Sequence, residues 1–517
     1  MLKQSNLKAI KNSCCIFQEK VNIIKYQLQN WIIVLLLSSV FWLSLISNVE
    51  AASQLPESHQ RHILSRLGFG ITTAQLEEVN RLGIESYIQS QLDPQSVTES
   101  PKVDRYLSKL DLIGREPIQL QKKVFTHRKK LKNSNLPLEQ QKKLRSRIRN
   151  IHRQARDDAM DAHLIQAIYS NRQLQEVMVD FWFNHFNVFA NKGYVRLWLN
   201  DYIAQIRTHA LGNFGDLLAM TARHPAMLMY LDNSKNTAPN SPVGLNRKRG
   251  LNENYARELM ELHTLGVDSG YTQEDIIALA KIFTGWGLNP PDDEEEDFFY
   301  FYEKRHDPED KVFLGHKISA SGIEEGEQAL DILATHPATA KFISYKLAQY
   351  FVADRPPSSL VDKLAREFIA SQGNIKTVLD TLIHSEEFNS SQYYKQKFTT
   401  PYQYVISLVR MAEIEQPSLL RVRGMLNQLS MPLYGCQVPT GYRNTQSAWL
   451  NPQAMLQRTG FAFAIANGVL NRDYTVKQQQ LTQNLGELSS KTKQVIANSP
   501  PKLRSPLIMG SPEAMYR

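Results

Sequence analysis

Cysteine is scarce in this chain, and its scarcity limits the chemistry that the protein can use. Three cysteines occur among 517 residues, at Cys14, Cys15 and Cys436. The first two precede a segment that we interpret as an export signal, so the exported part would retain Cys436 alone. One thiol can form neither an internal disulfide nor a cysteine-based metal site.

Signature motifs of the common enzyme classes are missing as well. The sequence has no GxSxG, HExxH, P-loop or dinucleotide fingerprint in the setting that each requires. The acidic run of residues 292–297 lacks the spaced ligands and the glycine of a calcium loop, so a solvated surface loop is the better interpretation. The sequence therefore leaves the cofactor unknown, and we assign no metal ligands.

An apolar run near the N-terminus predicts export. Residues 31–46 read WIIVLLLSSVFWLSLI, five lysines precede them, and Val49-Glu50-Ala51 supplies the small-x-small pattern of signal peptidase sites. We predict a cut after Ala51, which makes residues 1–51 a signal peptide. The run is shorter than the ~20 residues of a spanning helix, but the long leader leaves an uncleaved membrane anchor open. Either way, we expect the body in the periplasm, the cell envelope or the extracellular space.

Positive charge is concentrated in one block. The net charge of the chain is +9, yet residues 115–156 alone hold fourteen Lys or Arg against Glu116 and Glu139, a local excess of +12. The turn signature NSNLP at residues 133–137 divides the block and predicts a helical hairpin, inserted at the periphery of the core. We expect this arm to contact anionic lipid or acidic polysaccharide, and we expect no nucleic acid partner. The alternative is that the charges only solubilise an exposed helix pair.

Apolar spacing predicts a mainly α fold. Ile375, Val378, Leu379, Leu382 and Ile383 follow helical periodicity, and residues 164–229 are apolar with a helical pattern. Residues 298–302 and 312–314, joined by the turn HDPED, read as one small hairpin. We predict one large multi-helix domain over residues 55–470 with that β-hairpin inserted. Residues 471–517 are polar and contain several prolines, so we predict a disordered tail.

The first candidate site is the segment LNENYARELMELHTLG at residues 251–266. On a helix, Asn254, Arg257 and Glu261 share one stripe, and Glu258 lies half-buried beside it. Glu258 and Glu261 could act as a proton-transfer pair. The alternative is a polar brace in which Glu258 pairs with Arg257 or another helix. Both interpretations stay open, and His263 stands at the wrong spacing to complete a Glu-x-x-His metal motif.

The second candidate site is the segment DFWFNHFNVF at residues 180–189. Asp180, Asn184 and Asn187 form a narrow polar stripe on an otherwise apolar helix, which predicts a buried helix with one polar wall. His185 lies among aromatic residues, where a core histidine is the commoner case and a catalyst the alternative. We predict that this helix packs against the Asn254–Glu261 helix and that Asp180 and Glu258 face one cleft.

Two further polar groups have a structural and a functional interpretation each. Asp232 and Asn233 follow an apolar helix, where such residues usually form a cap or turn. Arg247 precedes the next helix N-terminus, and together they could bind an anion. His306-Asp307 could ligate a metal, although a turn favours Asp for ordinary reasons.

The same stretches resemble one family. The resemblance covers residues 59–467 and rests on these motifs: HILSRLGFG, WFNHFN, HPAMLMYLDNS, LNENYARELMELHTLG, YTQEDI, FTGWG, RHDPEDKVFLG, HPATAKF, KLAQYFV and GCQVPTGYRNTQSAWLNP. They are similar to the bacterial domain of unknown function 1800 (DUF1800).

The resemblance implies an exported protein without an established activity. Members of this family often occur beside an exported family of sulfatase-like fold, which implies a partner of that kind and shared work on envelope or extracellular polymers. Two functions therefore stay open. One is a hydrolase-like enzyme that uses Glu258, Glu261, Asp180 and His185, and the other is a non-catalytic structural or binding protein of the envelope.

Overall fold

A computed structural model describes residues 56–132, 136–247, 250–289 and 298–517, without the side chain of Arg247. Residues Glu57–Arg517 form one compact unit. The predicted signal or anchor at residues 1–51, the turn at residues 133–135 and the acidic run at residues 292–297 lie outside the described residues. Among the residues described, no helix is long and apolar enough to span a bilayer.

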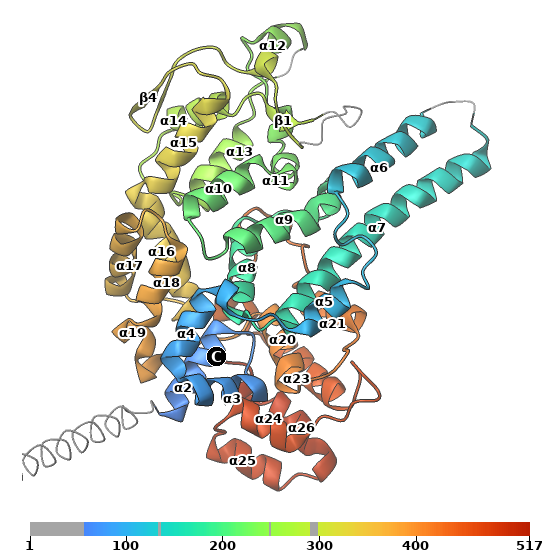
Figure 1. Cartoon of the computed structure of the whole chain (residues 1–517), viewed down its shortest axis with the longest axis vertical. Coiled ribbons are helices and arrows are strands. Elements are labelled where there is room, and N and C mark those ends of the chain that lie inside the picture. The colour runs from blue at the N-terminus through green and yellow to red at the C-terminus, as the bar shows by residue number, and fades with distance from the viewer. Residues whose placement is uncertain (1–55, 133–135, 248–249, 290–297) are drawn as a thin grey trace, which may run out of the picture. The chain divides into compact units, whose positions relative to one another are not determined.

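Helices dominate this unit, as the apolar spacing predicts (Figure 1). Local sequence signals set their ends. Thr72 and Gln75 form a capping box at the start of α3, and Gly83, with φ of 80°, ends that helix. Four short helices open the unit: α2 (Glu57–Leu67), α3 (Thr73–Leu82), α4 (Ile84–Leu92) and α5 (Pro101–Leu107).

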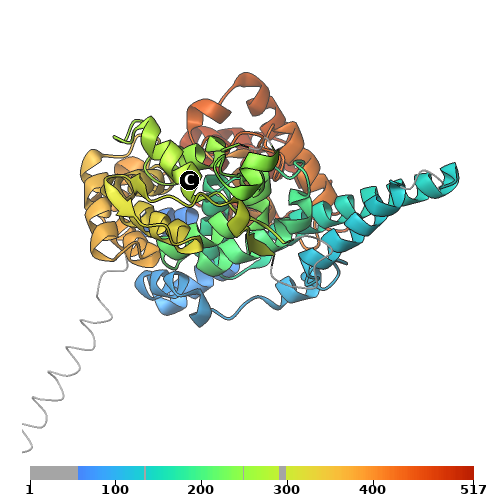
Figure 2. The same cartoon turned by 90° about the horizontal axis from the view of Figure 1, so that it is seen from above.

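The basic block forms two helices, α6 (Pro117–Leu131) and α7 (Leu138–Tyr169), which project together from the unit (Figures 1 and 2). Their inner parts nevertheless belong to the core. Val124 and Ile148 are buried in the main apolar cluster, and Trp198 donates to Gln121 Oε1 at 2.6 Å. The prediction that the whole block lies outside the core is therefore wrong, because only its outer part projects.

Two central helices follow, α8 (Gln173–His185) and α9 (Val195–His209), and both are buried along most of their length. The next helices lie beyond α9 in Figure 1: α10 (Phe214–Arg223), α11 (Pro225–Tyr230), α12 (Pro242–Arg247), α13 (Glu253–Glu258), α14 (Gln273–Ile282) and α15 (Ile323–Thr335). A π-helical turn, Leu259–His263, extends α13. The predicted 252–261 helix is thus present as an α–π pair.

Two small antiparallel ladders lie among these helices. β1 (Trp286–Leu288) pairs with β2 (Phe299–Phe301), and β3 (Lys311–Phe313) pairs with β4 (His316–Ile318). The mainly α class is confirmed, with little β structure. The predicted pairing of residues 298–302 with 312–314 is wrong, because HDPED leads into a buried ion cluster and does not form a hairpin turn.

The third group of helices comprises α16 (Pro337–Phe351), α17 (Ser358–Ala370), α18 (Ile375–Ile383) and α19 (Glu386–Asn389). The apolar residues that predict α18 are all buried. Two His-Pro pairs start helices in the same way. His224 Nδ1 accepts from the amide of Ala226, and His336 Nδ1 accepts from that of Ala338, each at 3.1 Å.

The chain ends in a further helical group: α20 (Pro401–Met411), α21 (Leu419–Gln428), α22 (Gln446–Trp449), α23 (Pro452–Ala466), α24 (Gln478–Leu485), α25 (Ser490–Ala497) and α26 (Pro501–Met509). The predicted disorder of residues 471–517 is therefore wrong. Leu481, Ile508 and Met515 are buried, and Tyr516 forms a bridge with Phe398. A few apolar side chains are enough to order this segment, because each one packs into the core formed by the preceding helices.

Candidate functional site

The predicted polar stripe at residues 180–187 faces the segment that contains GCQVPTGY, although α8 ends at His185 and Asn187 lies two residues beyond it. Asn184 Nδ2 donates to the carbonyl of Tyr442 at 2.8 Å, and Asn184 Oδ1 accepts from the Tyr442 amide at 2.7 Å. Asn187 Nδ2 donates to the carbonyls of Cys436 and Val438. Gly441 passes so close that a Cβ there would lie 2.2 Å from the Asn184 carbonyl oxygen. The two asparagines therefore fasten this segment to α8.

Asp180, the third member of the stripe, lies at a small cavity of about 30 Å³. Its Oδ2 accepts a hydrogen bond from Tyr350 Oη at 3.1 Å. Burial raises the pKa of Asp180 to about 6, against the opposing effects of Tyr350 and Arg517. This carboxyl group can therefore exchange a proton near neutral pH.

His163, Tyr402 and Tyr434 also line this cavity. All three are buried, and His163 Nδ1, Tyr402 Oη and Tyr434 Oη have no hydrogen-bond partner within the described part of the chain. A water molecule needs ~10–15 Å³ of probe-occupied space and two to four polar partners. The cavity thus has the size and chemistry to hold water beside Asp180.

His185 joins the two helices that we predict to pack together. Its Nε2 donates to the carbonyl of His263 at 3.0 Å, and the Phe186 and His263 rings lie 5.1 Å apart. Burial, reinforced by Lys346 and His263, holds the pKa of His185 well below its usual range. These contacts join the end of α8 to the π-helical turn that follows α13, and His185 is a neutral histidine bonded within the core. Packing of residues 180–187 against the helix at residues 254–261 stays a prediction.

Glu258 and Glu261 have separate surroundings. Burial first, and then Glu261, raises the pKa of Glu258, while Arg257 lowers it. Glu261 Oε1 lies 3.5 Å from Arg257 Nη1, and Arg257 also donates to Gln273 at 2.9 Å. The groups that shift the pKa of Asp180 are Tyr350 and Arg517, so different neighbours act on Asp180 and Glu258. The shared cleft stays a prediction.

The remaining predicted polar residues contribute to loop structure. Asp232, in left-handed conformation, binds Lys192 at 2.6 Å and Lys235 at 2.9 Å. Although burial opposes them, these lysines hold the pKa of Asp232 below its usual value. Asn233 is fully buried and donates to the carbonyls of Phe283 and Trp286 at the end of α14.

The predicted anion site at the start of α13 has a protein partner instead. Asn252 Oδ1 accepts from the Asn254 amide at 3.0 Å, and Asn254 Nδ2 donates to the Leu231 carbonyl at 3.4 Å. Arg247 ends α12, but its side chain lies outside the description. The free helix N-terminus on which the prediction rests is therefore already capped.

His306 and Asp307 belong to a buried ion cluster. Glu325, at the start of α15, accepts from Lys311 Nζ at 2.7 Å and lies 3.0 Å from His306 Nε2. Asp307 and Lys311 are both buried, with 3.6 Å between their charged groups. Each charge in the cluster has an oppositely charged neighbour, which explains how RHDPEDK enters the core. Within the described residues, no group of three His, Cys, Asp or Glu is placed to hold a metal.

Sequence reasoning missed His163, Tyr402 and Tyr434 beside Asp180. His163 carried a usable signal, since it is a polar residue in the apolar part of α7. The two tyrosines carried none, because their sequence positions are far from α8 and aromatic residues are ordinary core residues.

The comparison with family models identifies the chain. It belongs to the family described as protein of unknown function (DUF1800), whose model matches residues 62–516. The match extends beyond residue 467 to the C-terminal helices, in accordance with their place in the core. No curated protein and no solved structure matches the chain.

Proposed function

We propose that this protein is an exported, non-catalytic envelope protein whose basic arm binds repeated phosphate or carboxylate groups of anionic lipid surfaces or acidic polysaccharides. The arm is the basic block of residues 115–156, and the outer parts of its helices α6 and α7 project from the unit. The observation that carries the proposal is the exposure of its charge, since most cations of the block are exposed: Arg115, Lys123, Arg128, Lys129, Lys130, Lys132, Lys142, Lys143, Arg145, Arg147, Arg149 and Arg153.

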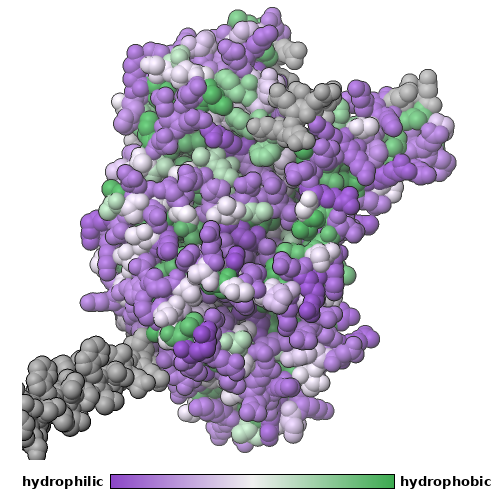
Figure 3. All heavy atoms as spheres, viewed as in Figure 1, coloured by the Kyte–Doolittle hydropathy of each residue, from purple (hydrophilic) through white to green (hydrophobic). Residues whose placement is uncertain are grey.

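Few of these cations have a carboxylate partner. In the described parts of the arm, the ion pairs are Lys142 with Glu139 and, at its base, Arg156 with Asp157. In Figure 3 the arm presents a mainly hydrophilic surface. Crowded like charges repel one another, and binding of an anion relieves this repulsion. The electrostatics of this surface therefore favour an anionic partner.

A groove between the two helices gives this charge a local geometry. Lys130 on α6 and Lys143 and Arg147 on α7 line it, together with Gln140, and its volume is about 410 Å³. The pKa of nearby His127 is lowered, first by burial and then by Arg147 and its cationic neighbours. The groove therefore combines three cations and one amide, and its lining contains no carboxylate.

The α8 region favours the non-catalytic interpretation for a different reason. Asn184, Asn187, His185 and Asn233 each make hydrogen bonds that fasten one backbone segment to another. Side chains held in this way act as braces. Of the residues that suggested an enzyme, His185 is thus explained by the fold.

Replacing Lys130, Lys143 and Arg147 by Gln tests the proposal. A cation near an anionic membrane contributes roughly 1 kcal/mol, so we expect affinity for phosphatidylglycerol-containing vesicles to fall about a hundredfold at low salt. The matched control replaces three exposed cations on α17 and α18, Lys363, Arg366 and Lys376, and should bind as the unmodified protein does.

Vesicle co-sedimentation and a dextran sulfate titration measure the two classes of partner separately. Loss of vesicle binding alone identifies lipid as the partner, and loss of dextran sulfate binding alone identifies an acidic polymer. Equal binding by the arm variant and the control in both assays would refute the proposal.

The Asp180 cavity favours a second function, a hydrolase that uses Asp180 as acid or base. The specific observation is a carboxyl group with a pKa of about 6 that shares a cavity with His163, whose Nδ1 has no hydrogen-bond partner among the described residues. The test compares the unmodified protein with Asp180→Asn on envelope polysaccharide by assaying new reducing ends. Activity that disappears in a folded variant would support the enzyme and contradict the non-catalytic proposal.

A further inference from the structure

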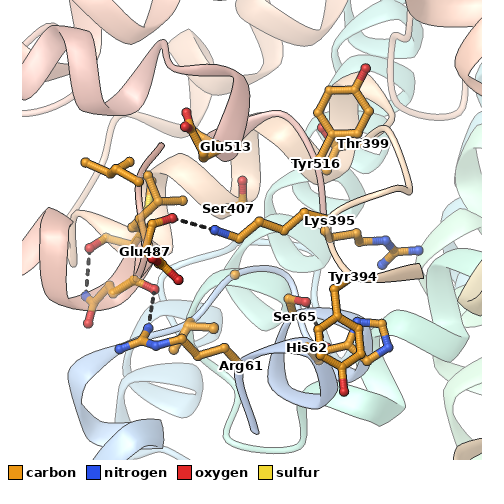
Figure 4. A pocket seen from close by; sticks show the side chains of 18 of the residues that line it. Arg61, His62, Ser65, Tyr394, Lys395, Thr399, Ser407, Glu487, Glu513 and Tyr516 are labelled. Carbon is orange, nitrogen blue, oxygen red and sulfur yellow. Dashed lines mark hydrogen bonds between the residues drawn. The ribbon is translucent and has the colours of Figure 1, made fainter. Parts of the chain in front are cut away.

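A larger cavity lies between α2, the residues around the start of α20, and the C-terminal helices (Figure 4). Its volume is about 540 Å³, and pockets for small molecules span ~300–1,000 Å³. Apolar side chains provide much of its lining: Phe69, Ile71, Met411, Leu485 and Leu488. The cavity is therefore large enough and apolar enough to hold an extended hydrocarbon chain.

The charged residues of the lining are mainly cations. Arg61, Lys395, Lys493 and Arg517 outnumber Glu487 and Glu513. Because Arg61 is already paired with Glu57 at 2.7 Å, the remaining excess is +1. Glu513 is already occupied, because it accepts from the Ser489 amide at 2.9 Å and from Thr492 Oγ1 at 3.0 Å. Although burial opposes them, these hydrogen bonds hold the pKa of Glu513 at about 2. The polar part of the cavity therefore favours an anion.

Lys395 is the cation best placed to meet that anion. Its side chain extends across the cavity in Figure 4, and Nζ donates to the carbonyl of Glu487 at 2.7 Å. Its backbone is in the left-handed region, with φ of 51°, which L residues adopt only when their surroundings require it. Burial lowers the pKa of Lys395. An ammonium group has three donors, so the bond to Glu487 leaves two for a ligand.

We propose that this cavity binds a single-chain amphiphile with an anionic head, a carboxylate or a phosphate. The hydrocarbon chain packs against the Phe69–Ile71 and Leu485–Leu488 walls, and the head bonds to Lys395 and Lys493. An apolar lining with an excess of positive charge fits this ligand class, because each half of the molecule finds a matching surface. The cavity shares no lining residue with the arm groove, so the two proposals stand or fall independently.

Equilibrium binding to the full chain tests the inference with three probes below their micelle-forming concentrations. The probes are palmitate, a palmitoyl lysophosphatidylglycerol and neutral monopalmitoylglycerol. We expect one saturable site for an anionic amphiphile and weaker binding of the neutral one. Tighter palmitate binding identifies a free carboxylate head, and tighter lysolipid binding identifies a phosphate head.

Two sets of variants locate the site. Lys395→Met with Lys493→Met removes both charges and should weaken binding of the anionic probes about tenfold, with little effect on the neutral probe. The control is Lys491→Met, a change of an exposed lysine on the same helix α25 that does not line the cavity. Ser65→Phe fills the cavity and should weaken all three probes.

Circular dichroism and thermal unfolding verify that each variant folds. If Ser65→Phe does not fold, the double lysine variant alone tests the location of the site. Absence of saturable binding by any probe would overturn the inference. So would an equal loss in Lys491→Met, or full retention of anionic binding in the double lysine variant. Retained palmitate binding in the Lys130, Lys143 and Arg147 variant is expected, because the arm groove is a separate surface.

Discussion

The polar residues at α8 are buried in the fold, whereas those of the arm are exposed, although both sets stand out in the sequence. Asn184 on α8 and Asn187 just after its end enter the interior, where backbone groups about 250 residues away satisfy them. On α6 and α7, cations such as Lys130 and Arg147 remain exposed with few carboxylates near them. Buried polar groups are bonded because an unsatisfied one costs free energy, whereas exposed charges remain available to a partner. The contrast supports our proposal that the arm binds a partner, whereas the asparagines at α8 hold the fold.

The largest loss of stability should come from a change in the buried ion cluster, whose polar groups are bonded within the interior like those at α8. Glu325→Ala leaves His306 without its carboxylate and Lys311 with the more distant Asp307 alone, and breaking a buried pair in this way costs about 3–5 kcal/mol. The exposed neighbour Glu324 provides the control, since Glu324→Ala should change stability by less than ~0.5 kcal/mol. Urea unfolding measures both. Similar values for the two variants would show that the cluster is not a brace.

A smaller loss should follow Asn184→Ala. The variant removes one donated and one accepted bond to Tyr442, and at ~1 kcal/mol for each bond the free energy of unfolding should fall by about 2 kcal/mol. Asn150→Ala, on the exposed face of α7, is the matched control and should be nearly neutral. If Asn184→Ala is equally neutral, the clamp on the GCQVPTGY segment does not hold the fold.

The pH dependence of stability should sharpen the difference between Asp180 and its neighbours on α8. Because burial raises the pKa of Asp180 to about 6, the folded protein retains this proton longer than the unfolded chain does. Ionisation of Asp180 therefore lowers stability as pH rises from about 4 to about 6, by an amount on the order of 3 kcal/mol.

Asp180→Asn should remove that part of the pH dependence. Urea midpoints of the variant and the unmodified protein at pH values across this window measure the difference, and all other titrating groups cancel in the comparison. Two parallel curves would mean that Asp180 titrates as an ordinary carboxylate, and the cavity would lose its special chemistry.

The smallest effect on stability belongs to the arm. Replacement of Lys130, Lys143 and Arg147 by Gln should change the free energy of unfolding by less than ~0.5 kcal/mol, with a slight gain at low salt as repulsion between like charges falls. Thermal unfolding at low and high salt measures it. A loss of stability comparable to that of Asn184→Ala would show that these cations help to hold the fold, and it would weaken the binding proposal.

Sequence reasoning succeeded where local signals decide the outcome. The apolar spacing of Ile375, Val378, Leu379, Leu382 and Ile383 indicates a helix, and α18 covers these residues. It failed where distant contacts decide. The C-terminal segment looks disordered by composition, yet Leu481 and Ile508 are buried against earlier helices.

The candidate site shows the same limit. The stripe on α8 was visible, and so was its burial, because a polar row on an apolar helix implies an interior wall. Its partners were not predictable, since Tyr442 and Cys436 reach α8 through the fold of the whole chain. His306 and Asp307 were read as part of a hairpin turn, because Glu325, the carboxylate that pairs with His306, is brought close only by the tertiary fold.

Hydrogen exchange of the full chain with and without phosphatidylglycerol vesicles tests the contrast between the arm and α8 most directly. We expect the vesicles to slow amide exchange in the outer parts of α6 and α7, as binding there restricts local opening, and to leave α8 unchanged. The Lys130, Lys143 and Arg147 variant should lose this protection. Protection that appears in α8 instead, or binding of vesicles without any slowing in the arm, would contradict the assignment of the arm to binding and of α8 to structure.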